Sequence, residues 1–501
     1  MTLTYGLRVD VPFLPDAGAI NPALRDSLGL ETGRLPSGNP LWSPRLGVSY
    51  DIGGRGMTFL RGSVGLFSGH PAYRWIANGY HDSGGEQLRL TCDGADAPHF
   101  DPFNPPTTCG TGAVAVPLIT VFDPDLKYPQ NWKLALGMDR RLPWGLVATA
   151  DLLYTYWVSQ LYFTDANLSP PIGTAAGEGG RLLYGIIAGD GRETPSRINP
   201  AFGPVVRVSN RSGDQAFLAS GQLQREFGSG FGLSASYTYT YAVDAFSLSR
   251  FNSPAILADT PLDGSLADRQ IATSFFSGPH RVAITASVAL PLRSRFSLIY
   301  QGSSPAPYTY VVQPGPGNSG DINADGINAG GAEFVAGGQD IVYVPRDVRP
   351  GGDISLVTLD DATGAFVPAP ASVYASLEKF VASEQCLNRE RGRIMARNSC
   401  RDPWYGELDA RLAVDMPTAR RQSIQVTVDV ANLPALLHLP DLNPIWTPTY
   451  RAISFGERSV PLLELEGYDA VNQRGIYSLV LPARSPVGQS WNMQLGVRYS
   501  F

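Results

Sequence analysis

The sequence predicts an all-β fold, an antiparallel up-and-down β-barrel that spans a membrane with about twelve strands. Three observations predict it: short units in which apolar and polar residues alternate, an alternation of short and long connections, and an amphipathic C-terminal segment ending in Phe501. The composition agrees, because 54 Gly and 41 Pro among 501 residues, with only 17% charged residues, favour short strands joined by turns.

The first observation is a period of two, which sends successive side chains of a strand to opposite faces. In the first unit, Leu3, Tyr5 and Leu7 fall on one face and Arg8 and Asp10 on the other. The pattern occupies residues 2–11, 45–52, 132–139, 231–243, 424–430 and 491–501. Tyrosines on the apolar side of 231–243 are typical of the aromatic girdle at a membrane interface.

The second observation concerns the connections. Short turns are predicted at 53–56, 141–145, 228–230, 291–294 and 417–421. Long connections are predicted at 12–42, 69–129, 158–215, 244–279, 304–406 and 433–489. Outer-membrane barrels have short periplasmic turns and long extracellular loops, so this alternation favours a barrel over a soluble sandwich. If residues 2–11 rise from the periplasm, the twelfth strand descends and the C-terminus is periplasmic.

The third observation is the end of the chain, where Val497, Tyr499 and Phe501 alternate with polar residues. A closing amphipathic strand with a terminal Phe resembles the signal read by the outer-membrane assembly machinery. The sequence therefore predicts that machinery and outer-membrane lipid as partners, and the cell outer membrane of a Gram-negative-type bacterium as the location.

Charge and hydropathy exclude other classes. The net charge of -6 gives no basic face for nucleic acid, and no run approaches the roughly 18 apolar residues of a spanning helix. A mean hydropathy of -0.07 does not argue against a barrel, because alternating strands cancel the signal. The segment MTLTYGLRVDV has no signal-peptide features, so we expect the chain to begin inside a longer one.

The four cysteines form two pairs that are local in sequence and lie in turn-rich stretches. We expect disulfides between Cys92 and Cys109 and between Cys386 and Cys400, as an oxidising compartment allows. Four unpaired thiols are the alternative, because four cysteines permit three connectivities. A cysteine metal site is disfavoured by the absence of CxxC spacing.

Five segments resemble the C-terminal barrel of Oar-like TonB-dependent receptors: YPQNWKLALGMDRRLPWGLVATADLLYTY at 128–156, SGPHRVAITASVALP at 277–291, DINADGIN at 321–328, RNSCRDPWYGELDARLAVDMP at 397–417 and VTVDVANL at 426–433. The resemblance implies a barrel of about 22 strands with an N-terminal plug and a box that contacts a TonB-type energy transducer. On this reading residues 1–501 are the C-terminal part of the barrel, and the plug and the signal peptide are absent from them.

Catalytic motifs are not found in the sequence. The five histidines are scattered, and neither HExxH nor GxSxG occurs, so we expect no enzymatic activity. The one metal-like motif is DINADG, in which Asp321, Asn323 and Asp325 occupy positions 1, 3 and 5 of a calcium loop and Gly326 position 6. Position 12 is Ala332 instead of Glu, so structural calcium, the only candidate cofactor, competes with a plain cluster of Asx turns.

Three functions remain open. The leading hypothesis is an outer-membrane receptor or transporter for an unknown ligand, energised through a TonB-type system in the full-length protein. An outer-membrane adhesion or surface-organisation protein is the alternative, and a soluble carbohydrate-binding β-protein is the third. Charged residues predicted to face the lumen include Arg8, Asp10, Asp51, Arg61, Asp139, Asp151, Asp409 and Arg411. They could mark a substrate path, but pairing across a polar interior is their simpler role.

Overall fold

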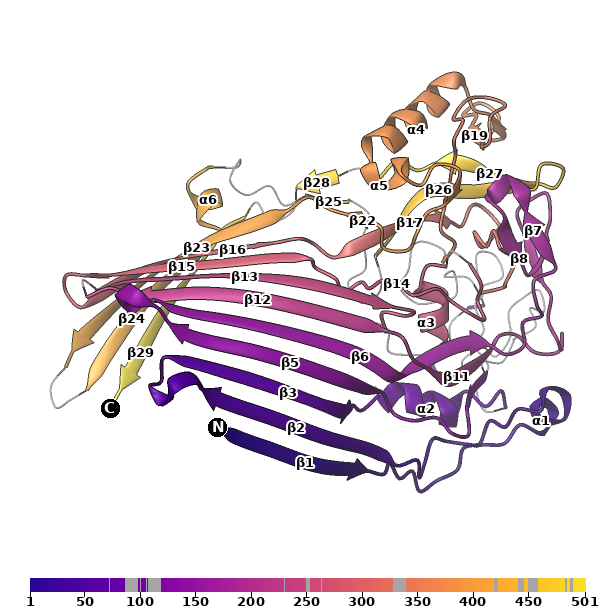
Figure 1. Ribbon diagram of the computed structural model, residues 1–501. Coiled ribbons are helices and arrows are strands. Elements are labelled where there is room, and N and C mark those ends of the chain that lie inside the picture. The colour runs from indigo at the N-terminus through magenta and orange to yellow at the C-terminus, as the bar shows by residue number, and fades with distance from the viewer. Residues whose placement is uncertain are drawn as a thin grey trace.

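The computed structural model describes residues 1–71, 73–85, 98–99, 101–104, 106, 119–228, 230–248, 253–262, 264–327, 339–418, 422–439, 446–448, 458–482, 484–486 and 490–501. Within these residues twelve strands follow one another in a single path, here called the membrane sheet (Figure 1). They are β1 (Thr2–Asp10), β2 (Leu41–Asp51), β3 (Thr58–Ser68), β5 (Gln130–Arg141), β6 (Val147–Asp165), β12 (Gln215–Glu226), β13 (Phe231–Asp244), β15 (His280–Leu290), β16 (Ser294–Ser303), β23 (Tyr405–Pro417), β24 (Ser423–Ala431) and β29 (Asn492–Ser500).

Strands of the membrane sheet that follow in sequence are neighbours in space, and every neighbouring pair is antiparallel. This is the up-and-down topology that the alternating segments predict. The path ends at β1 and β29 among the described residues. Both termini lie at the end of the sheet that carries the short turns (Figure 1).

The pairing register keeps the two faces of the sheet separate. Val426 lies opposite Val497, whereas the next residue, Gln425, lies opposite Arg498. The face that collects the apolar side chains is exposed, with Tyr5 81% and Val497 75% accessible. Because a continuous exposed apolar face of this kind is typical of a surface that contacts lipid, we call it the outward face and the other the inner wall.

The short connections at 53–56, 141–145 and 291–294, which lie within the described residues, are tight turns, as predicted. Short 3-10 segments, η1 (Ile52–Gly54) and η3 (Pro143–Gly145), occupy two of them. In the turn before β16, Leu292 and Arg293 both have positive φ, at 63° and 56°. Positive φ at both central residues is what a type I′ turn requires, and the twist of this turn matches that of paired strands.

The long connections fold into a second region, here called the loop cap, at the other end of the sheet (Figure 1). Its largest sheet has the order β20-β19-β27-β26-β17-β22. These strands are β17 (Pro307–Gln313), β19 (Ser355–Leu359), β20 (Phe366–Pro368), β22 (Cys400–Arg401), β26 (Arg458–Asp469) and β27 (Arg474–Leu479). β17 and β26 pair in parallel although they come from different long connections.

The remaining elements of the loop cap are short. Its helices are α1 (Pro22–Leu28), α2 (Tyr73–His81), α3 (Ser253–Asp259), α4 (Ala371–Ser383), α5 (Gln385–Asn388), α6 (Leu433–Leu436) and the 3-10 turn η4 (Ala176–Glu178). Its other strands are β4 (Ile119–Phe122), β7 (Gly173–Ala175), β8 (Arg181–Leu183), β9 (Gly185–Ile187), β10 (Glu193–Pro195), β11 (Val205–Arg211), β14 (Ala272–Thr273), β18 (Tyr343–Val344), β21 (Arg393–Ile394), β25 (Trp446–Pro448) and β28 (Arg484–Pro486). None of the described helices is long and apolar enough to cross a membrane.

The buried apolar residues gather in the loop cap. One core contains Tyr308, Leu377 and Leu465, from β17, α4 and β26. Another contains Trp75 and Phe163, whose rings meet edge to face at 6.0 Å between centroids. The sequence predicted these segments only as long loops; the structure gives them a packed interior because their apolar residues come together from several connections.

Candidate functional site

Several charged side chains on the inner wall are paired with one another. Arg61 on β3 lies 3.0 Å from Asp139 on the neighbouring strand β5 and 3.3 Å from Asp151 on the next strand, β6. At the other side of the sheet, Arg411 lies 3.5 Å from Asp429. The wall is therefore polar without carrying a free band of one charge, which suits contact with water or with a polar filling of the lumen.

The other predicted lumen charges also have local partners. Arg8 and Asp10 form an ion pair at 2.7 Å. Asp51 accepts a hydrogen bond from the amide of Gly56 in the turn after β2, and Asp409 accepts one from the amide of Asn432. These contacts agree with the structural role and single out none of these residues as a ligand contact.

The middle of strands β12, β13 and β15, between Glu226 and Arg281, presents an uncharged section of the inner wall. The register places Gln222 opposite Thr149 and Ser236, and Ser236 opposite Ala283. Small hydroxyl and amide groups offer donors and acceptors without fixing a charge. The inner wall thus has a neutral hydrogen-bonding section between two sections that carry ion pairs.

The calcium-like motif lies buried in the loop cap. Asp321, Asn323 and Asp325 come together, with 3%, 3% and 0% of their surface accessible. Asp321 Oδ2 accepts the amide of Gly326 at 2.7 Å, and the φ of +71° at Gly326 supplies the sharp turn of the motif. The local loop geometry predicted from the sequence is present.

The set of ligand atoms for a cation is incomplete, although the loop has the expected geometry. The carboxylate oxygens of Asp321 and Asp325 accept amide hydrogens from the loop, and Asp325 also accepts the side-chain amide of Gln339. In the described residues no three His, Cys, Asp or Glu side chains are grouped so that they could hold a metal ion. Position 12, Ala332, lies outside the described residues. Calcium binding therefore stays a prediction.

Burial and mutual repulsion raise the carboxyl pKa values in this loop. The pKa of Asp325 rises to about 8, chiefly through desolvation and then through the charge of Asp340. The pKa of Asp321 is raised well above its ordinary value for the same reasons, with Asp325 as the nearest repelling charge. The loop consequently favours protonated carboxyls near neutral pH unless a cation compensates them.

A buried ion group joins three long connections of the loop cap. Arg181 lies 3.7 Å from Glu178 and 3.5 Å from Asp340, and it donates to the carbonyl of Ile341 at 2.6 Å. Glu178 in turn accepts the hydroxyl of Tyr477 at 2.7 Å. Arg181, Asp340 and Tyr477 come from different connections, so this group fixes the connections relative to one another.

A second charged junction joins the loop cap to the rim of the membrane sheet. Arg397 donates to Asp244 Oδ1 at 2.8 Å and also to its carbonyl. Asp214 lies in the turn before β12, and its Oδ1 accepts the amide of Ala245 at 3.2 Å. Burial and the nearby charge of Asp244 raise the pKa of Asp214 to about 7.

One predicted disulfide is formed. Cys386 and Cys400 are bonded, with 5.2 Å between their Cα atoms, and they tie α5 to β22 inside the loop cap. Cys92 and Cys109 lie outside the described residues, so their pairing stays a prediction. At the C-terminus, Val497, Tyr499 and Phe501 are exposed, and the rings of Tyr499 and Phe501 stack at 5.9 Å, so this apolar surface is accessible to a partner.

Sequence reasoning missed the two charged groups of the loop cap. The segments that hold Glu178, Arg181 and Asp340 show no periodicity. Arg181 meets Ile341, which is 160 positions away, and Glu178 meets Tyr477, which is 299 positions away. No local signal marks such groups. Only the Asp340 position had an indirect signal, since the incomplete calcium loop requires oxygen atoms from elsewhere.

Comparison with known families decides the class of the protein. The family model described as "Outer membrane beta barrel domain" matches residues 13–444. The chain belongs to this outer-membrane β-barrel family. Its fold is the large antiparallel sheet of an outer-membrane barrel, and its location is the Gram-negative outer membrane.

Solved structures similar to this barrel are outer-membrane transporters and receptors. The outer membrane transporter YddB from Escherichia coli is 10% identical, covering 92% of this chain and 41% of its own, with a TM-score of 0.42. The siderophore receptor PirA from Acinetobacter baumannii is 11% identical, with 79% and 37% covered and a TM-score of 0.35. The ferric enterobactin receptor PfeA from Pseudomonas aeruginosa is 10% identical, with 81% and 36% covered and a TM-score of 0.35.

The barrel spans only about two fifths of the length of these solved chains. No match was found among curated protein sequences. The family assignment accordingly rests on the matched residues, and the ligand and the energy source belong to the proposal that follows.

Proposed function

We propose that this barrel is part of an outer-membrane receptor for uptake, of the Oar-like TonB-dependent kind. In the proposal the loop cap recognises a ligand that is still unknown, and a TonB-type transducer supplies energy through an N-terminal region of the full-length protein. The inner wall carries the proposal, because it is largely polar and several of its charges pair with one another. A wall of this kind can face a polar plug and a hydrated solute. The proposal gives the chain no catalytic role.

Completion of the barrel is the second part of the proposal. The membrane sheet has open edges at β1 and β29 in the described part of the chain, and unpaired backbone groups in a bilayer have no water to satisfy them. We infer that strands and a plug from a longer protein close the barrel. Residues 1–501 alone should then fail to give a heat-modifiable band on a gel, whereas the upstream-extended protein should give one. A stable pore formed by residues 1–501 alone would contradict this.

Uptake assays on the full-length protein test the receptor function itself. Cells that express it should accumulate or grow on one class of solute, and deletion of either the receptor gene or the energy transducer should abolish this gain. Saturable uptake that survives loss of the transducer would remove the energised mechanism and leave the barrel.

Surface organisation is the alternative function. The folded structure of the loop cap is the observation that supports this alternative. If deletion of the receptor gene abolishes cell adhesion but leaves every tested uptake unchanged, the adhesion reading replaces the transport reading. The outer-membrane location is common to both.

A further inference from the structure

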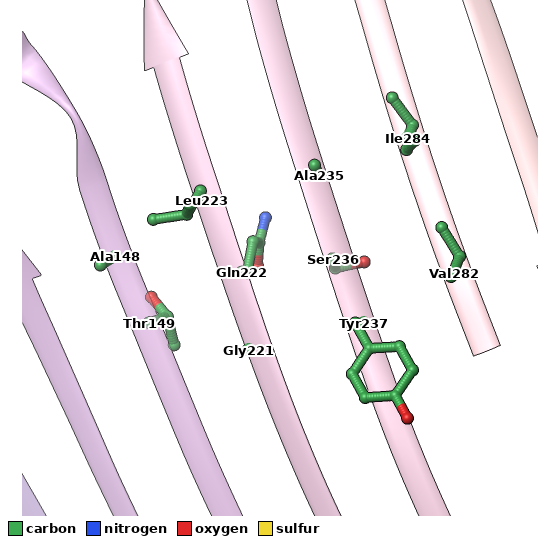
Figure 2. A pocket seen from close by; sticks show the side chains of 10 residues that line it. All are labelled: Ala148, Thr149, Gly221, Gln222, Leu223, Ala235, Ser236, Tyr237, Val282 and Ile284. Carbon is green, nitrogen blue, oxygen red and sulfur yellow. The ribbon is translucent and has the colours of Figure 1, made fainter. Parts of the chain in front are cut away.

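The outward face of the membrane sheet is hollowed where β6, β12, β13 and β15 lie side by side (Figure 2). The hollow has a volume of about 440 Å³. Its outward-facing lining consists of Ala148, Gly221, Leu223, Ala235, Tyr237, Val282 and Ile284. A side-chain carbon added at Gly221 would meet no atom within 4 Å, so small residues leave real space there.

The occupant of this hollow must be apolar. Thr149, Gln222 and Ser236 also border it, but the register places their side chains on the inner wall. Toward the lipid the lining is hydrocarbon except for one phenol. Since the surrounding lipid is itself apolar, an acyl chain gains no hydrophobic free energy here; it gains dispersion contacts with the walls on several sides.

A polar group stands beyond the loop-side end of the hollow. The hydroxyl of Tyr237 lies 2.7 Å from Nδ1 of His280, the first residue of β15, and the ring of Tyr239 lies 5.6 Å from the imidazole. When the hydroxyl donates to Nδ1, the ring carries its proton at Nε2, from which it can donate to a ligand. Arg401 adds a positive charge near this group, because its guanidinium donates to the carbonyls of Pro305 and of Ser277, three residues before His280.

An apolar hollow that ends at exposed hydrogen-bond donors and a positive charge matches the two ends of a membrane lipid. We infer that it binds one acyl chain of an outer-leaflet lipid whose phosphate accepts a hydrogen bond from His280. The inference does not require transport, so it goes beyond the proposed function. It makes the section of wall formed by β12, β13 and β15 a specific lipid contact.

The test uses the full-length protein in nanodiscs of phosphatidylcholine that contain a minor fraction of spin-labelled phosphatidylglycerol. Gly221→Leu fills the hollow, and His280→Phe removes the donor but keeps an aromatic ring. Ala219→Leu is the matched control, because Ala219 is one step along the same face of β12 and does not line the hollow. Each variant is first checked for a heat-modifiable band, which confirms folding.

The wild type should immobilise phosphatidylglycerol in preference to spin-labelled diacylglycerol, which has the same acyl chains but no phosphate. Loss of a hydrogen bond to a charged group should weaken that preference about tenfold in His280→Phe. Gly221→Leu should abolish the immobilised signal, and Ala219→Leu should keep it. Equal immobilisation of the two lipids by the wild type, or an unchanged signal in folded Gly221→Leu, would overturn the inference.

Discussion

The membrane sheet exposes the apolar residue types that the loop cap buries. In the membrane sheet, Tyr5 is 81% exposed on the outward face, whereas Tyr308 in the loop cap is completely buried. Backbone hydrogen bonds between neighbouring strands hold the sheet together, and its exposed apolar side chains are suited to contact with lipid. The cap buries apolar residues as a water-soluble domain does. The membrane sheet is thus suited to lipid and the loop cap to water, and the boundary between the two regions lies at the rim of the sheet.

Removal of the central arginine of the loop cap should have the largest effect. Arg181→Leu leaves Glu178 and Asp340 buried without their cation, which typically costs about 3 to 5 kcal/mol. We expect hydrogen exchange of 339–344 and 474–479 to accelerate while the membrane sheet keeps its protection. Arg192→Leu is the control, because Arg192 is 69% exposed and its pair with Asp190 is worth little. Equal exchange in the two variants would mean that the buried ion group does not hold the cap.

A charge on the outward face should affect only the membrane sheet. Leu136→Arg puts a guanidinium against lipid and should cost about 2 to 4 kcal/mol near mid-bilayer. Ala135→Arg places the same charge on the inner wall and should cost much less, because the two residues are adjacent in β5 and face opposite ways. Urea titration of the full-length protein folding into vesicles measures both. Similar costs would reverse the assignment of the faces.

Loss of the disulfide should affect only the loop cap. Replacing Cys386 and Cys400 by Ser opens a closure 14 residues apart in sequence, worth about 3 kcal/mol in the chain-entropy model. Proteolysis near α5 should become faster, while the heat-modifiable band of the full-length barrel stays. A reduced wild type should behave like the double variant. Loss of the band would show that the cap supports the barrel itself.

The pH dependence of the DINADG loop should be the most local effect. The folded-state pKa of Asp325 is about 8 against an ordinary value of 3.8, so the folded loop holds a proton that the unfolded loop has lost. Local stability should therefore fall as pH rises from about 4 to about 8 and then level off. Exchange of the amides at 322–327 measures it, and Asp325→Asn should flatten the profile.

Calcium would reverse that trend, which makes the same measurement a test of the sequence-based metal prediction. A bound cation favours ionised carboxylates, so in its presence the loop should become more stable as pH rises. Identical profiles with calcium and with a chelator would leave the motif as a cluster of Asx turns.

The membrane sheet could be predicted from the sequence because the alternating pattern of each strand is local. Alternation in a segment such as 424–430 is set by the two faces that it meets, whatever its neighbours are. The alternation of short and long connections then fixes the order of the strands. The predicted disulfide between Cys386 and Cys400 succeeded for a related reason, since its partners are close in sequence.

The loop cap was not predictable because its contacts are distant in sequence. β17 pairs in parallel with β26, and neither segment shows which strand it will join. Tyr477 meets Glu178 across 299 positions. The sequence around a buried charged residue such as Glu178 has no pattern that predicts its burial or its partner. The calcium motif lies between these cases: its loop geometry is local and was found, but the charges that set its proton affinity come from elsewhere.

Strand β6 has 19 residues, and only its first part belongs to the membrane sheet alone. Its later residues pair with β11, which pairs in parallel with β4, so one continuous backbone runs from the wall into the cap. Segments of the cap are therefore poor units for exchange between relatives. A graft of residues 158–215 into another barrel would have to carry the partners of Arg181 and Glu178 from two further connections. The loops of this barrel should thus diversify together, as one surface.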